Sequence, residues 1–136
     1  MKKITTAVLL VVLLGVAGVY ARLHFKMPED PKVMKFQASA DTLLQGLEQY
    51  KEFVGSYPIG PNAEVIKALQ GKSPKKVVIV STQKSVLNDK GEAIDPWGTP
   101  LKFYFSGNSV LIRSAGPNKA WDDSSVPNSD DLYRSN

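Results

Sequence analysis

Five oxygen-bearing side chains near the C-terminal end are the residues of this chain whose types and spacing could do chemistry. They lie in the stretch SAGPNKAWDDSSVPNSDDL, and they are Asn118, Asp122, Asp123, Asp130 and Asp131. Carboxylate and amide oxygens on a loop are ligands that hard cations accept. The alternative for the same residues is a solvated acidic loop that holds no ligand.

Groups for bond chemistry are scarce elsewhere. The chain has no Cys and a single His, His24, and no Ser or carboxylate pair stands at a recognisable spacing from a base. Nucleophilic and general acid–base catalysis both need such pairs. We therefore expect no enzymatic activity, and a periplasmic enzyme, as a third class of function, would have only the aspartate loop for its titratable groups.

The net charge of +4 is confined to the N-terminal segment. Of the 17 Lys and Arg residues, Lys2, Lys3, Arg22 and Lys26 precede Met27, which leaves 13 to balance the 13 Asp and Glu that follow. A neutral domain without a cluster of basic and aromatic side chains does not favour contacts to a phosphate backbone. We expect no nucleic-acid partner.

Residues 1–26 are typical of a segment directed to the inner membrane. Two lysines precede an uncharged run from Ile4 to Ala21, which as a helix would be roughly 27 Å long against a hydrocarbon core of about 30 Å. Val19 to Ala21 also suit a signal peptidase, so a retained anchor and a cleaved signal both stay open. The lysines favour a cytoplasmic N-terminus. We expect a single-pass protein with a periplasmic domain or, after cleavage, a soluble periplasmic one.

Residues 27–136 predict one α+β domain. Apolar residues at three- and four-residue steps indicate a long amphipathic helix at about 32–56. A short helix follows at about 62–70, with Asn62 as its N-cap. The long helix's stripe consists of Val33, Phe36, Ala40, Leu43, Leu44, Leu47, Tyr50 and Val54.

Strand patterns occupy the second half of the chain. KVVIVS at 76–81 reads as a buried strand or as an extended loop under the helix. Alternating apolar residues at 101–114, interrupted by SGNS, predict a β-hairpin with Leu101, Phe103 and Phe105 on one face. An acidic loop at 115–132 follows, so we expect the long helix to pack on a small antiparallel sheet.

The DPWG sequence before the hairpin predicts a tight turn. Asp95 can accept hydrogen bonds from backbone amides ahead of it, Pro96 presets its own φ, and Gly98 tolerates a positive φ. Trp97 is favoured as a packing lid at the base of the sheet, with stacking on a ligand as the alternative.

Taken in series, these motifs resemble the major pseudopilin of type II secretion and its type IV pilin-like relatives. The segments that carry the resemblance are LEQYKEFVGSYP at the end of the helix, LNDKGEAIDPWGTPLKFYF, and IRSAGPN followed by DDL, within about 38–132. The family fold is a helix whose first half lies in the membrane and whose second half packs on a small antiparallel sheet. The resemblance implies a structural subunit of a periplasmic filament for protein export, with the inner membrane, like subunits and secretion-machinery components as its partners.

The resemblance also implies a Ca²⁺ site in the tail loop. Matched motif to motif, Asn118 stands where the family usually has Asp, Asp130 and Asp131 fall on the terminal acidic pair, and Asp122 and Asp123 lie in an insertion. The loss of one charge and the longer loop predict a weaker site than the charge-rich ones. Trp121 is then an anchor for this loop or an exposed contact.

The N-terminal segment departs from the family pattern. No basic leader ending in Gly-Phe and followed by an early Glu is found, and no acidic residue precedes Glu29. Two functions therefore stay open: a divergent pseudopilin-like subunit that assembles helix against helix, and a stand-alone membrane-tethered or periplasmic binding module that does not form filaments.

Overall fold

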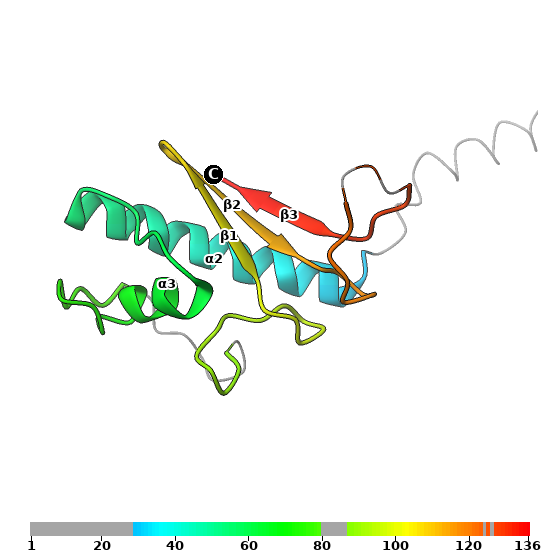
Figure 1. Cartoon of the computed structure of the whole chain (residues 1–136), viewed down its shortest axis with the longest axis horizontal. Coiled ribbons are helices and arrows are strands. Elements are labelled where there is room, and N and C mark those ends of the chain that lie inside the picture. The colour runs from blue at the N-terminus through cyan, green and yellow to red at the C-terminus, as the bar shows by residue number, and fades with distance from the viewer. Residues whose placement is uncertain (1–28, 80–86, 124, 126) are drawn as a thin grey trace, which may run out of the picture.

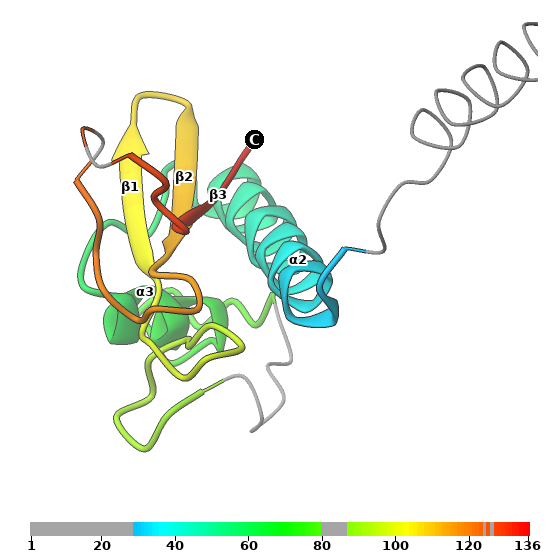
Figure 2. The ribbon, with the colours of Figure 1, turned by 90° about the vertical axis from the view of Figure 1, so that its right-hand side faces the viewer.

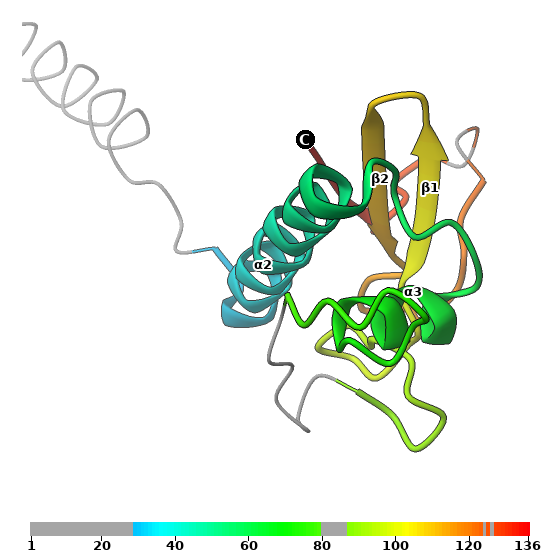
Figure 3. The same ribbon diagram turned by 90° about the vertical axis from the view of Figure 1, so that its left-hand side faces the viewer.

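The structure, a computed structural model, describes residues 29–79, 87–123, 125 and 127–136. In these residues two helices, α2 (Pro31–Val54) and α3 (Asn62–Leu69), accompany one antiparallel sheet of three strands (Figure 1). The strands are β1 (Lys102–Ser106), β2 (Ser109–Ser114) and β3 (Leu132–Ser135), in that order across the sheet. Figures 2 and 3 show α2 beside the sheet and α3 at the end away from the β1–β2 turn. The predicted α+β class is confirmed.

Helix α2 begins and ends at residues that carry capping signals. The Asp30 carboxylate accepts a hydrogen bond of 2.8 Å from the N–H of Lys32, and Pro31 lies in the first turn, where its missing N–H costs nothing. Gly55 ends the helix with φ +92°, and its N–H donates to the carbonyl of Lys51 at 2.7 Å.

The apolar stripe of α2 forms one side of the core, as its periodicity predicts. Val33 and Val54, at the two ends of the stripe, are only half-buried. Helix α3 and strand β2 supply most of the opposite side. The buried core residues of these three elements are Phe36, Ala40, Leu43, Leu44, Leu47 and Tyr50 from α2, Val65, Ile66, Ala68 and Leu69 from α3, and Val110 and Ile112 from β2.

The predicted hairpin is confirmed, but the sheet has a strand that the sequence pattern did not predict. β1 and β2 pair from Ser106↔Ser109 outward around a two-residue turn in which Gly107 has φ +56°. β3 then pairs with β2 on its other side, from Ser114↔Leu132 to Leu111↔Ser135. Four residues of mixed character carry little strand signal alone, so this strand depends on the neighbour with which it pairs.

Asn62 was predicted as the N-cap of α3, and this prediction was wrong. The cap position is Pro61, and the Asn62 side chain reaches across to the chain before β1. Its Nδ2 donates to the carbonyls of Ala93 and Leu101 at 2.9 and 2.8 Å, and its Oδ1 accepts from the Ala93 N–H at 2.7 Å. A residue suited to capping is used here to hold two distant segments together.

The prediction of a buried strand at 76–81 also fails where it can be compared. Up to Ile79 the chain makes only an isolated bridge, Gln70↔Val78, and Val78 is 70% exposed. Ile79 packs against the core, which agrees with the alternative of an extended loop. Residues 80 and 81 lie outside the described residues.

The predicted membrane segment, 1–26, lies outside the described residues too. Among the helices that the structure describes, none has both the length and the apolar character needed to cross a bilayer.

A charged pair joins the helix to the last strand. Arg134 of β3 donates to both carboxylate oxygens of Asp41 in α2, from Nε at 2.6 Å and from Nη2 at 2.9 Å. Both side chains are more than two-fifths exposed, so solvent screens the interaction. The hydrogen bonds from Arg134, followed by its charge, hold the pKa of Asp41 below its ordinary value despite some desolvation.

We expect Asp41→Asn to reduce the acid sensitivity of the fold. A carboxyl group whose pKa is lowered by folding stabilises the protein above its unfolded pKa, and this stabilisation is lost as the pH falls through the folded pKa. Between about pH 5 and pH 3 the wild type should therefore lose more free energy of unfolding than the variant. Urea unfolding at both pH values measures the difference, with the exposed Asp89 changed to Asn as the control. An equal pH dependence in wild type and Asp41→Asn would contradict the assignment.

We expect Asn62→Asp to destabilise the chain almost as much as Asn62→Ala, by about 1–3 kcal/mol in urea unfolding. Asp keeps the accepting oxygen but loses the Nδ2 donor that serves the Ala93 and Leu101 carbonyls. Asp is also among the best N-cap residues. An Asp variant as stable as the wild type would therefore restore the capping role and refute the bridging one.

Candidate metal centre

The loop between β2 and β3 is anchored by a buried polar chain that starts in the DPWG turn. Asp95 is 4% exposed, and its Oδ1 accepts from the N–H groups of Trp97 and Thr99 at 3.0 and 2.8 Å, as the turn sequence predicts. Its Oδ2 accepts from the Ser114 hydroxyl at 2.7 Å. The same hydroxyl oxygen accepts from the Gly116 N–H at 3.1 Å. The turn therefore positions the chain where it leaves β2 and enters the loop.

Trp97 is half-buried, and Lys32 of α2 places its Nζ 5.9 Å from the centre of the ring. The ring is therefore beside the first turn of α2 and is not among the partly buried side chains that pack against the core, so its role as a packing lid stays a prediction. Gly98, next in the turn, has φ +91°, as the turn type requires.

Gly116 lets the two ends of the loop touch. It has φ +67°, and a Cβ atom on it would lie 2.1 Å from the carbonyl oxygen of Asp130. Any other residue would force these two segments apart. On the far side of this contact, the N–H of Asn118 donates to Asp130 Oδ2 at 3.0 Å.

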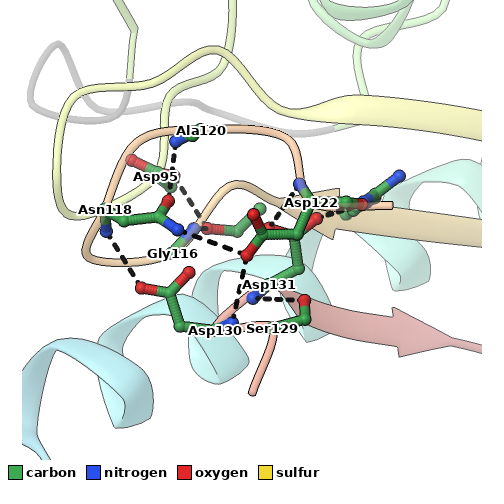
Figure 4. A network of polar contacts seen from close by, with 10 residues as sticks. Asp95, Gly116, Asn118, Ala120, Asp122, Ser129, Asp130 and Asp131 are labelled. Atoms are coloured by element: carbon green, nitrogen blue, oxygen red, sulfur yellow. Dashed lines mark hydrogen bonds and ion pairs between the residues drawn. The ribbon is translucent and has the colours of Figure 1, made fainter. Parts of the chain in front are cut away.

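Three carboxylates gather inside the closed loop. Asp122, Asp130 and Asp131 each offer an oxygen, and these atoms all lie within 4.8 Å of one another (Figure 4). Asp122 and Asp130 are half-buried, and Asp131 is buried at 8% exposed. Asp122 lies in the middle of the loop, and Asp130 and Asp131 lie at its C-terminal end, so the cluster requires the loop to fold back on itself.

The Asp130 side chain has an oxygen that no protein group satisfies. Its Oδ2 accepts from Asn118, but Oδ1 is buried and makes no hydrogen bond. A buried carboxylate oxygen without a partner costs free energy unless a cation, a water or a donor approaches it. Its place within the cluster makes a bound cation the simplest remedy.

Arg113 of β2 brings a positive charge to the cluster. Its Nε donates to Asp131 Oδ2 at 2.5 Å, and its Nη2 contacts the same oxygen and the carbonyl of Asp122. Burial lowers the pKa of Arg113, but the contributions led by the Asp131 hydrogen bond raise it by more, so the guanidinium stays charged. The cluster thus carries three carboxylates and one resident cation.

Asn118 and Asp123, the other two predicted ligands, have different positions. Asn118 supports the cluster: its Nδ2 donates to Asp122 Oδ2 at 3.2 Å, while its Oδ1 accepts from the Ala120 N–H at 2.7 Å. Asp123 is exposed and is not one of the three clustered carboxylates. The structure therefore brings together three of the five predicted residues and places a fourth beside them.

Trp121 anchors the loop on the sheet. Its half-buried ring lies between two cations, with Lys102 Nζ at 4.0 Å and the Arg113 guanidinium carbon at 5.4 Å from the ring centre. This agrees with the expected anchor for the loop. Such contacts hold the residue next to Asp122 in place.

Sequence reasoning missed three residues that build the site: Arg113, Ser114 and Gly116. Ser114 and Gly116 are part of the IRSAGPN segment that carries the resemblance, but the sequence alone assigned a structural role to neither of them. Arg113 stands at an outward position of the alternating VLIRS pattern, which is compatible with any exposed strand residue. Its partner Asp131 is 18 positions away, beyond the reach of a local pattern.

The cluster can hold a hard cation through oxygen ligands. Ca²⁺ takes six to eight oxygens from carboxylates, carbonyls and water in flexible geometry. Three carboxylates with one unsatisfied buried oxygen fit such an ion in ligand type and in charge.

A hollow of about 420 Å³ has Trp121 as one of its lining residues. It is bordered by the 60–62 segment, the first half of β1 and the Trp121 ring, with Phe103 and Tyr104 among its aromatic walls. Among the described residues that line it, Glu92 and Lys102 are the charged ones.

In comparisons with known proteins, no family model matches the chain, and no curated protein or solved structure matches it either.

Proposed function

We propose that this chain is a pseudopilin-like structural subunit that assembles with copies of itself in a type II secretion or type IV pilus-like filament. The observation that carries the proposal is that α2 has two different faces. One stripe packs on a small antiparallel sheet, and the opposite stripe, called the open stripe below, is exposed to solvent. In the sequence, an uncharged run suited to a membrane, Ile4 to Ala21, ends nine residues before this helix.

The open stripe of α2 suits contact with another helix. Ala38, Thr42, Gln45 and Gln49 follow one another at three- and four-residue steps, and all four are exposed and uncharged. Large apolar residues stand near its two ends, with Met34 56% exposed and Phe53 73% exposed. A face without charge in its middle costs little to desolvate when a neighbouring helix covers it.

The proposal includes Ca²⁺ at the cluster of Asp122, Asp130 and Asp131. The ion would tie the middle of the loop, at Asp122, to its C-terminal end and so stiffen the surface beside β3, a structural role that involves no bond chemistry. The buried, unpartnered Asp130 Oδ1 supports this part. Asn118 would act as a supporting residue, and Asp123 would not be a ligand.

The alternative function, a tethered or periplasmic binding module, is favoured by one observation. The aromatic-walled hollow beside Trp121 has the size and lining common in ligand sites. The two functions differ in whether α2 meets α2 of a neighbouring copy.

Cross-linking in membranes tests assembly. The chain has no Cys, so Thr42→Cys and Gln45→Cys each place a single thiol on the open stripe, and Ser109→Cys in the exposed hairpin is the matched control. We expect oxidation to give disulfide-linked dimers with the two α2 variants and not with the control. N-terminal sequencing of the same fractions shows whether the membrane segment is retained. A soluble chain that starts at Arg22 and gives no α2 dimers would refute the subunit and favour the binding module.

Calcium should raise the melting temperature of the full chain in detergent. For a Kd of about 0.1 mM, typical of weak sites, about 1 mM Ca²⁺ adds roughly 1.4 kcal/mol, or a few degrees. Mg²⁺ should add little because it demands a strict octahedral shell and dehydrates reluctantly. Asp122→Asn and Asp130→Asn should lose the gain, and the adjacent Asp123→Asn should keep it. An equal response in all four proteins would rule out this site.

A further inference from the structure

Arg113 occupies oxygens that a metal ion in the acidic cluster would also use. Its guanidinium donates to Asp131 and to the Asp122 carbonyl, and both residues belong to the cluster of three carboxylates. Among the described residues it is the one cation that forms an ion pair with this cluster. A side chain and a metal are therefore candidates for the same oxygens.

The guanidinium is held firmly in this position. Arg113 pairs with Lys102 of β1 on one side and with Tyr133 of β3 on the other. The rings of Trp121 and Tyr133 each lie 5.4 Å from its guanidinium carbon. Its side chain is only 16% exposed. A planar cation between two aromatic rings is pre-oriented for a carboxylate and loses little further freedom when it binds one.

The closed loop needs a positive charge beside the cluster. Three carboxylates within 4.8 Å repel one another, and the Asp131 side chain has no exposed surface at all. A buried carboxylate without a partner is costly. Whatever neutralises Asp131 therefore decides whether the loop can close.

We propose that Arg113 is the internal counter-cation of this cluster, which closes the loop without metal and competes with a divalent cation for Asp131. The proposal deepens the function proposed above, because it rests on the same three carboxylates as a cation site. It makes the wild-type loop largely independent of metal and sets a high Ca²⁺ threshold. Without Arg113, the same loop becomes dependent on Ca²⁺ for its closure.

The test uses Arg113→Gln in the full chain, purified in detergent. Melting temperature is measured in EDTA and across a Ca²⁺ titration. We expect the variant to melt at least about 5 °C below the wild type in EDTA and to recover most of this loss in millimolar Ca²⁺. The midpoint of its Ca²⁺ titration should lie about tenfold or more below that of the wild type, since a competing charge has been removed.

Arg134→Gln is the matched control. It removes the other described arginine–aspartate pair, which joins β3 to Asp41 and lies outside the cluster. Its loss of stability should be the same in EDTA and in Ca²⁺. Recovery of this variant by Ca²⁺ would show a general salt effect and would overturn the inference.

The remaining outcomes separate this inference from the proposals on which it builds. If Ca²⁺ stabilises the wild type but Arg113→Gln shows the same midpoint, the competition is refuted and the metal site stands. If neither protein responds to Ca²⁺, the inference and the calcium site are both refuted, and filament assembly is decided by the cysteine cross-linking experiment alone.

If only the variant responds, Arg113 is confirmed as the counter-cation, and the wild-type protein does not bind Ca²⁺ at this site. Should Arg113→Gln not fold, Arg113→Lys decides, because Lys cannot bind bidentately: a lower Ca²⁺ midpoint supports the competition and an unchanged one refutes it.

Discussion

The hydrogen bond between Asp95 and Ser114 is the interaction on which the second half of the molecule depends. It joins a turn before the hairpin to the last residue of β2, both of them buried. The same carboxylate holds the turn through two backbone amides, and the same hydroxyl holds Gly116 at the entry to the loop. One side chain thereby sets the end of β2, the start of the loop and hence the place where β3 can pair. A polar chain of this kind stabilises a structure only when every member is satisfied, which is the case here.

The two surfaces that carry the proposals lie on different sides of the domain. Because side chains alternate along a strand, Arg113 points away from the face on which Ile112 packs into the core. The acidic cluster and the Trp121 ring are therefore on the side of the sheet remote from α2. The open stripe of α2 faces outward on the other side. Contact between helices would leave the loop accessible, so assembly and cation binding do not exclude each other.

Local patterns predicted the fold where local rules decide it. The α2 stripe, the DPWG turn and the hairpin follow from periodicity and turn chemistry, and all three are confirmed. Asn62 shows the limit, because a side chain that can cap a helix can equally bridge Ala93 and Leu101, and only the tertiary structure chooses. The site divides in the same way: clustered acids mark a loop, but the pairing of Arg113 with Asp131 requires β2 and β3 to be neighbours.

The contact between Gly116 and Asp130 has a consequence for how this loop can change. Between Asp122 and Asp130, which both belong to the cluster, added length contributes to stability mainly through closure entropy, at about 0.6 kcal/mol for each doubling. Residues inserted between Asp123 and Ser129 would therefore cost little, whereas a single methyl group at Gly116 would collide with the Asp130 carbonyl at 2.1 Å. This loop can therefore change in length between the two ends of its acidic cluster, but it cannot accept a side chain at Gly116 unless Asp130 moves.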